Sequence, residues 1–496
     1  MVKLNHIEAK SCSSSGSSNC ESTAYSSSNS SSQDIDFSEK SEEEIVKGLL
    51  FKMDCRIIPY ISLLYLFSFL DRVNIGYARL YKMEEELHLN QFQYGWSLSI
   101  FFISYVIFEV PSNLLLKKYS PSVWIARIMV TWGALTIALG FVKNFAGLMA
   151  GRFFLGMAEA GLFPGVLYYL SFWYTRRDIG FRLALFCSSA NLAGGLSGLL
   201  AYTMSKIDGT WGISGWQWIF IIEGILSVIF GFTTIWLLPN SPSTAKWLNQ
   251  TEKFYVVQRL LEDHRDPTNK SFCKKQFLES FVDYKVYFHM IIHFGLITPL
   301  YCVAQLLPTI ISQMGFSKLT TLLLTAPPYM VAVITNILLC RHSDKKMERG
   351  MHLCVPILVS ITGFMMMIFI KSKYGRYAGS CVTVIGVFTA GPISLTWMTN
   401  NMVGSTKSAT ASALLVSYGN IGGFISGMMF RSSEAPRYTH SLIANIGFLV
   451  SSLIAILLYR FLLIRENSKL DTKLKDPNYD WTGPDGLNMR NFRYVT

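Results

Sequence analysis

The sequence predicts an all-α membrane protein with twelve transmembrane helices in two halves of six. Of its 496 residues, 51% are hydrophobic and only 15% are charged, whereas soluble proteins carry about 25% charged residues. Runs of about 20 apolar residues, each long enough to cross a bilayer as a helix, recur from Ile57 to Ile464. A lipid-exposed chain must satisfy its own backbone hydrogen bonds, so these runs predict helices.

The order of these segments defines the domain organisation. A Ser-rich tail over residues 1–55 precedes a first half at 56–238, a polar middle loop at 239–285, a second half at 286–464 and a second tail at 465–496. The predicted spans are 57–79, 92–116, 121–142, 145–171, 181–203 and 216–238, followed by 286–312, 318–340, 352–371, 375–399, 406–430 and 441–464.

An internal echo supports two matching halves. The pattern of Asn191, Gly194, Gly195, Ser197 and Gly198 in the fifth span returns as Asn420, Gly422, Gly423, Ser426 and Gly427 in the eleventh. Small residues let helices approach closely inside a membrane, so we interpret the echo as helix packing in preference to substrate contact. Paired halves of this kind are typical of transporters with a central cavity.

The distribution of Lys and Arg predicts the orientation. An even number of spans places both tails and the middle loop on one side, which holds most of the basic residues near span ends, including Lys117, Lys118, Arg176 and Arg177. Basic residues are enriched on the cytosolic side of membrane proteins. We therefore expect cytosolic tails, and we expect the plasma membrane in preference to an internal membrane.

Ionisable residues within the predicted spans are the main functional signal, because a charge in the bilayer is costly. They lie in the first half: Asp71, Arg72, Glu109, Arg152, Glu159 and Glu223. At about 1.5 Å per residue, Asp71, Arg152 and Glu223 lie at similar depths on three helices. Arg152 and Glu159 are two turns apart on one face of the fourth span.

These charges predict an anion site above a proton site. A guanidinium matches the geometry of a carboxylate, so Arg152 and Arg72 are expected to bind an organic anion. Glu159 is expected to carry the coupling proton, and Asp71 is a second candidate for proton coupling that pairs with an arginine when the site is empty. The alternative is that these groups only hold the bundle together, and we favour that role for Glu109 and Glu223.

The second half offers weaker polar signals. Gln305 and Trp397 are candidate substrate contacts, although Trp397 could equally be an interfacial anchor. The Pro327–Pro328 pair is expected to break the eighth span. His289 and His293 lie one turn apart without a third ligand, so we expect no metal site.

Other functional classes are excluded by what the sequence lacks. The net charge of +12 is spread over span ends without a Lys/Arg tract, which argues against nucleic-acid binding. The nine cysteines form no CxxC pair, and HExxH, GxSxG and nucleotide-loop motifs are absent, so no enzyme and no cofactor are expected. The partners expected are a small organic anion and membrane lipid, with the protein acting as a monomer.

Four motifs resemble the fungal allantoate permease family, an anion:cation symporter branch of the major facilitator superfamily that includes nicotinate, pantothenate and biotin transporters. They run from Phe69 to Ala78, from Phe108 to Leu115, from Arg152 to Gly165 and from Gly215 to Gly224. The ending Asp480-Trp-Thr482 followed by Phe492-Arg493-Tyr494 is similar to the tail of that family.

The resemblance implies the major facilitator fold and proton-coupled uptake of a small, vitamin-like carboxylate. Related anion carriers have an arginine at Arg72 and an arginine and glutamate at Arg152 and Glu159. The superfamily's acidic turn after the second span is replaced by residues 113–118, which contain no acid, whereas the turn after the eighth span keeps Asp344 and Arg349, the expected gating pair. The alternative hypothesis is a transporter-like nutrient sensor without significant flux.

Overall fold

The computed structural model describes residues 42–175, 178–204, 206–262, 273–429, 434–435, 437–474, 490 and 492–496. Its contacts separate residues 1–48 from residues 49–496, and the arrangement below concerns the second unit. Most of the two predicted tails falls outside the described residues. Arg176 and Arg177 of the first half fall outside them as well.

The described residues form helices and turns, with no strand among them. The first half comprises α1 (Glu42–Leu80), α2 (Met83–Glu86), α3 (Gln91–Lys118), α4 (Pro121–Leu139), α5 (Phe145–Glu159), α6 (Leu162–Leu170), α7 (Ile179–Met204), η1 (Thr210–Gly212) and α8 (Gly215–Leu237). The second half comprises α11 (Tyr284–Ser312), α12 (Lys318–Leu324), α13 (Ala326–Lys346), α14 (Gly350–Phe369), α15 (Lys373–Asn401), α16 (Ser405–Met429) and α17 (Thr439–Lys473).

These helices confirm the predicted fold class. Each of the twelve predicted spans coincides with a helix, or with a pair of helices where a span is broken. Ten of the spans in the described chain are long and apolar enough to cross a membrane by length and composition alone. The other two, α3 and α16, contact one another across the two halves. The middle loop is more ordered than we predicted, because it contains η2 (Pro242–Thr244), α9 (Gln250–Glu262) and α10 (Lys274–Val282).

The two broken spans have identifiable causes. The fourth span stops at Glu159 and restarts after Gly161, whose φ of 92° lies in the left-handed region that suits glycine. The eighth span is interrupted at Thr325, next to the predicted Pro327–Pro328 pair. Proline lacks an N–H and clashes with the preceding turn, so the predicted break is confirmed.

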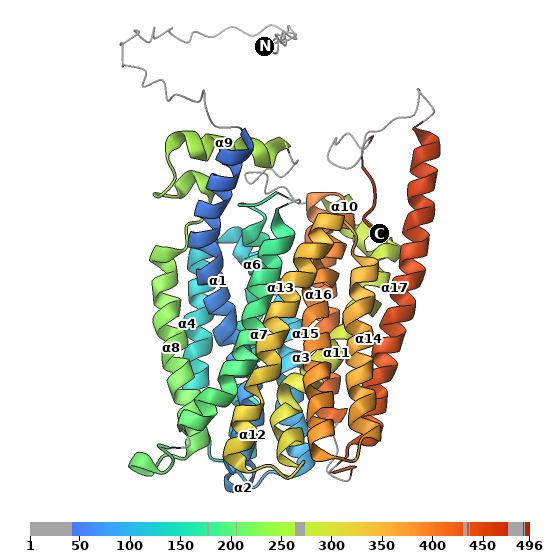
Figure 1. Cartoon of the computed structure of the whole chain (residues 1–496). Helices are drawn as coiled ribbons and strands as arrows, with labels where there is room; N and C mark the ends of the chain where they lie inside the picture. Colours follow the sequence, from blue (N-terminus) through green and yellow to red (C-terminus); the bar gives the residue numbers. More distant parts are fainter. Residues whose placement is uncertain are drawn as a thin grey trace, which may run out of the picture. The chain divides into compact units, whose positions relative to one another are not determined.

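The helices of residues 49–496 run side by side as a bundle (Figure 1). Helices α9 and α10 and the Lys473 end of α17 lie at one end, which we call the tail end, and α2 and α12 lie at the other, which we call the loop end. The principal contacts between the halves join α7 to α13 and α3 to α16.

Glycines of the echoed motif lie at these contacts. A Cβ atom at Gly194 would meet the Tyr329 ring of α13, and one at Gly423 would meet the Phe102 ring of α3. Gly198 and Gly427 are similarly close to the opposite half. The interpretation of the echo as helix packing is therefore confirmed for its glycines.

Candidate functional site

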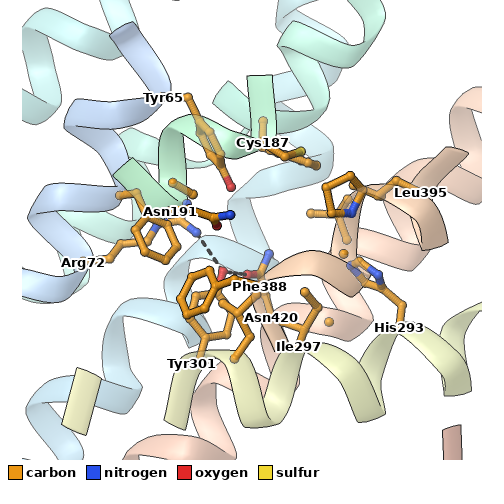
Figure 2. A pocket seen from close by; sticks show the side chains of 18 of the residues that line it. Tyr65, Arg72, Cys187, Asn191, His293, Ile297, Tyr301, Phe388, Leu395 and Asn420 are labelled. Atoms are coloured by element: carbon orange, nitrogen blue, oxygen red, sulfur yellow. Dashed lines mark hydrogen bonds between the residues drawn. The ribbon is translucent and has the colours of Figure 1, made fainter. Parts of the chain in front are cut away.

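A cavity lies between the two halves, with about 660 Å³ of space free of protein atoms, part of it continuous with solvent. Aromatic side chains and neutral polar groups dominate its wall. The first half contributes Tyr65, Phe69, Arg72, Tyr105, Phe163, Cys187, Ala190 and Asn191, and the second contributes His293, Ile297, Leu300, Tyr301, Phe388, Gly391, Pro392, Leu395, Val416, Gly419 and Asn420. Figure 2 shows that Arg72 and Asn191 face Tyr301 and Asn420 across this space.

Arg72 is the one arginine among the residues that line this cavity. Its Nη2 lies 2.6 Å from Glu159 Oε1, and its Nη1 donates a 2.8 Å hydrogen bond to the hydroxyl of Tyr301. The guanidinium also lies 4.9 Å from the ring centroid of Tyr105. Tyr301 in turn donates to Asn420 Oδ1 at 3.2 Å, so a polar chain from Arg72 crosses from the first half to the second.

Glu159 is fully buried behind Arg72, at the end of α5 where the span breaks. Its Oε1 accepts hydrogen bonds from Arg72 Nε at 2.8 Å and from the Ser68 hydroxyl. Its Oε2 has no hydrogen-bond partner in the structure. A buried carboxylate with one oxygen unsatisfied is costly, and the positive charge of Arg72 offsets part of that cost.

Arg152 is buried and does not line this cavity. Its Nε donates to the backbone oxygen of Ser97 at 3.2 Å, and its guanidinium lies 5.2 Å from the ring centroid of Phe101. The ring of Phe101 also lies 5.4 Å from the guanidinium of Arg72, so it contacts both arginines. The sequence correctly placed Arg152 and Glu159 in one span, but the described partner of Glu159 is Arg72.

Asp71 and Glu223 are two further buried carboxyl groups, and they lie close enough to interact electrostatically. Asp71 Oδ2 accepts from the indole of Trp132 and, at 3.4 Å, from Thr136, while Glu223 Oε2 accepts from the amide of Asn74. The second oxygen of each carboxyl group has no hydrogen-bond partner in the structure. Two neighbouring buried carboxyl groups are strongly unfavourable when both are charged.

The contacts of Asp71, Arg152 and Glu223 therefore differ from those that the sequence predicted. Asp71 and Arg152 interact electrostatically, yet no arginine lies within ion-pair distance of Asp71 in the described part of the chain. The expected pairing of Asp71 with an arginine is thus wrong in this conformation, because Arg72 is held by Glu159 and Arg152 is held behind Phe101. Glu223, predicted to be structural, is the partner of Asp71.

The two predicted contacts from the second half lie away from this cavity. Gln305 is buried with neither amide atom hydrogen-bonded, and its backbone oxygen packs against Gly76 of α1. Trp397 is buried towards the tail end, where its indole donates to the backbone oxygen of Val495 at 2.7 Å and its ring packs against Tyr459. It therefore contacts the chain's own tail.

Sequence reasoning missed most of the neutral polar groups of the wall, among them Tyr301, Asn191 and Asn420. A signal was present for the two asparagines, because each begins one copy of the echoed motif. His293 also lines the cavity, with its Nδ1 3.5 Å from the Ser394 hydroxyl. Nothing in the sequence marks Tyr301, which is one of 24 tyrosines.

The predicted gating pair forms an ion pair at the tail end. Asp344 Oδ1 lies 2.5 Å from Arg349 Nη2, and Arg349 also donates to the Ser343 hydroxyl at 3.0 Å. Asp344 reaches the first turn of α7 in the other half, where a Cβ atom at Gly180 would lie 2.8 Å from its Oδ1. A carboxylate at a helix N-terminus is electrostatically favourable.

Polar contacts between single side chains also join the two halves. Towards the tail end, Asn336 of α13 donates to the Ser188 hydroxyl of α7 at 2.9 Å. Towards the loop end, the Ser99 hydroxyl of α3 donates to the backbone oxygen of Phe424 at 2.9 Å, and the Lys318 ammonium lies 3.8 Å from the ring centroid of Tyr81.

Comparison with known proteins gives consistent matches. The model of the Major Facilitator Superfamily matches residues 61–427. The chain is 35% identical to the MFS transporter prlL of Fungal sp. (strain NRRL 50135) over 79% of this chain and 81% of that protein. It is also 35% identical to a putative tartrate transporter of Agrobacterium vitis over 76% of this chain and 86% of that protein.

Among solved structures, the chain resembles the proton:xylose symporter XylE, with a TM-score of 0.64 and 15% sequence identity over 81% of this chain and 94% of that chain. At this identity the likeness concerns the fold.

Proposed function

The chain belongs to the major facilitator superfamily and is a membrane transporter, and from this premise we propose that it carries a small organic anion together with protons by alternating access. The observation that carries the proposal is Arg72, a buried guanidinium at the cavity wall whose charge is balanced by the carboxylate of Glu159. The proposed coupling of anion and proton transport follows from the charge balance of Arg72 and Glu159.

The empty site is electrically neutral. Arg72 and Glu159 sum to zero, so a bound carboxylate would leave one negative charge in a buried environment, which is strongly unfavourable. If Glu159 takes a proton as the anion binds, the site stays neutral and the guanidinium exchanges one carboxylate for another. Anion and proton then bind together because each makes the other's binding favourable.

The carboxyl groups of Asp71 and Glu223 can hold a proton in addition to Glu159. Arg152 balances one negative charge, and Asp71 and Glu223 supply that charge when one of the two carboxyl groups is protonated. We propose that this pair exchanges its proton with Glu159 during the cycle, because Asp71 and Glu159 interact electrostatically. Arg152 then acts on the anion through its charge, from behind Phe101.

The cavity wall suits a monocarboxylate with a flat ring. One guanidinium can bind one carboxylate bidentately, and the aromatic wall, which includes Tyr65, Phe163 and Phe388, offers faces for stacking. The putative tartrate transporter is a relative whose name specifies a carboxylate. Within this class we propose a vitamin-like acid such as nicotinate as the substrate, carried into the cell across the plasma membrane, with the tail end cytosolic.

The test is uptake by the reconstituted protein. Proteoliposomes with an acidic exterior should accumulate radiolabelled nicotinate more strongly than tartrate, and collapse of the pH gradient should abolish accumulation. The Glu159→Gln variant should still exchange internal for external substrate, yet it should no longer concentrate substrate, because it cannot release a proton.

The matched control is Glu252→Gln, since Glu252 pairs with Lys52 at 2.8 Å in a partly exposed position outside the cavity. This control should behave as the unmodified protein. Accumulation by Glu159→Gln against a gradient would remove the coupling role, and a protein that binds substrate without any flux would instead be a sensor.

A further inference from the structure

The end of the described chain occupies a groove at the tail end of the second half. Residues 492–496, which we call the terminal strap, run without helical structure against the ends of α11, α14, α15 and α17. The groove contains buried side chains, because Trp397, Asn401 and Arg349 are each at most 3% exposed.

Two asparagines hold the backbone of the strap. Asn467 of α17 donates from Nδ2 to the Tyr494 oxygen at 2.8 Å and accepts from the Tyr494 N–H at 2.9 Å. Asn401 of α15 makes the same pair with Val495, at 2.9 Å and 2.8 Å. Each amide thus satisfies both backbone groups of one residue, as a neighbouring β-strand would.

The strap also supplies acceptors to groups that would otherwise be unsatisfied. The Thr496 oxygen accepts from the N–H groups of Arg349 and Gly350 at 2.9 Å and 3.2 Å. These N–H groups lie at the start of α14, where no helical acceptor is available. The Val495 oxygen accepts from the indole of Trp397 at 2.7 Å, which gives this buried donor a partner.

Side chains add contacts to the outer helices. Lys285 of α11 donates to the Tyr494 hydroxyl at 3.1 Å and lies 4.4 Å from the centroid of its ring. Arg493 forms an ion pair with Asp471 of α17 at 2.7 Å. The five-residue strap therefore joins four helices, and each of its described contacts lies within the second half.

We propose that this groove is a peptide-binding site for the chain's own residues 492–496, and that the bound strap positions the Asp344–Arg349 gate for transport. Arg349 connects the two, because its backbone N–H contacts Thr496 while its side chain holds Asp344. Asp344 in turn reaches Gly180 of the first half. Asn401, Asn467 and Trp397 are positioning residues in this scheme.

The location of the contacts also determines how the strap behaves during the cycle. Alternating access moves one half against the other, and the strap bridges elements of a single half. It can therefore stay bound throughout the cycle and keep the tail ends of α11, α14, α15 and α17 together as a rigid body. This inference does not depend on the identity of the transported anion.

The first experiment removes one backbone donor. Val495→Pro eliminates the N–H that Asn401 accepts, while Val495→Leu keeps it and serves as the matched control. In proteoliposomes, Val495→Pro should lower the maximal transport rate about tenfold, the effect of about 1.4 kcal/mol. The KM should stay within about twofold, because no cavity residue is touched. An unchanged or raised maximal rate would overturn the proposal.

The second experiment keeps the proposal testable if Val495→Pro does not fold. Asn467→Ala removes the amide that donates to the Tyr494 oxygen and accepts from the Tyr494 N–H, while Ser468→Ala changes an exposed neighbour and serves as the matched control. Asn467→Ala should lower the maximal transport rate and leave the KM within about twofold, whereas Ser468→Ala should change neither. A maximal rate for Asn467→Ala equal to that of Ser468→Ala would contradict the proposal.

Discussion

Arg72 and Arg152 are both buried in the first half, yet their surroundings give them different tasks. Arg72 has a carboxylate, a tyrosine hydroxyl and the cavity around it. Arg152 has a backbone oxygen and the face of Phe101. Only Arg72 can contact a solute in this cavity, whereas Arg152 contributes a positive charge from behind the wall.

At the residue scale, the prediction concerns the shape of the cation. Arg72→Lys keeps the charge, but one ammonium cannot hold Glu159, Tyr301 and a substrate carboxylate with the bidentate geometry of a guanidinium. Loss of one charged hydrogen bond costs about 1.5–3 kcal/mol, so the KM for the anion should rise about 10- to 150-fold in uptake assays.

The control is Arg79→Lys on the same helix, where Arg79 pairs with Glu84 at 3.0 Å and does not line the cavity. Its KM should remain near that of the unmodified protein. A normal KM for Arg72→Lys would show that the guanidinium does not bind the anion.

At the scale of elements, the break between α5 and α6 sets the position of Glu159. The helix ends at the glutamate, and Gly161 reverses the sign of φ so that α6 can continue across the bundle. Gly161 also packs against Ser112 of α3, so closely that a Cβ atom would clash with the serine side chain. The break therefore depends on glycine for both its conformation and its contact.

The corresponding prediction is that Gly161→Ala destabilises the protein. An L-residue in the left-handed region costs about 1–2 kcal/mol, to which the clash with Ser112 adds. The apparent melting temperature in detergent should fall by several degrees. Gly447→Ala in α17 is the control, because no atom lies within 4 Å of a Cβ at Gly447, and alanine in a helix should leave stability unchanged or raise it by about 1 kcal/mol. Equal melting temperatures for the two variants would refute this account of the break.

At the scale of the whole bundle, the cavity lies between two sets of contacts that join the halves. On the tail side, Asp344 lies against Gly180 of α7 and Asn336 donates to the Ser188 hydroxyl, whereas on the loop side Lys318 lies over the ring of Tyr81. Alternating access requires that these sets open in turn, so weakening one set should shift the balance between conformations.

We therefore predict that Asp344→Asn opens the tail side more often. It removes a negative charge from the N-terminus of α7 in the other half, an interaction worth about 1 kcal/mol. Cys187 lines the cavity and reports the opening. Its alkylation by a maleimide added from the tail side should accelerate about fivefold.

Two controls accompany the alkylation measurement. Lys345→Gln changes an exposed neighbour and should leave the rate unchanged. The measurement uses a background in which the other eight cysteines are replaced by serine, because Cys55 is exposed, and Cys187→Ser in this background should remove the signal and so identify the labelled thiol. If Asp344→Asn does not accelerate labelling, the pair does not act as a gate on this side.

Composition and the lengths of the apolar runs predicted the fold class, and they identified the polar residues that lie within the membrane. Apolar run lengths set the twelve spans because a helix must cross a fixed thickness of hydrocarbon. The Pro327–Pro328 pair marked a real break, because the loss of an N–H is a local effect. The charged residues were likewise evident in the sequence, because charged side chains are rare among the apolar residues of a membrane span.

The packing of helices in three dimensions decides which of these groups contact one another. Depth along a helix follows from counting residues, but the facing direction and the partner depend on how neighbouring helices pack. Glu159 therefore pairs with Arg72 on α1 rather than with Arg152 on its own span, and Glu223 proves to be the partner of Asp71. Trp397 belongs to the groove of the terminal strap because residues about 100 positions apart fold against each other. Such long-range pairings are set by packing in three dimensions, which no local sequence pattern encodes.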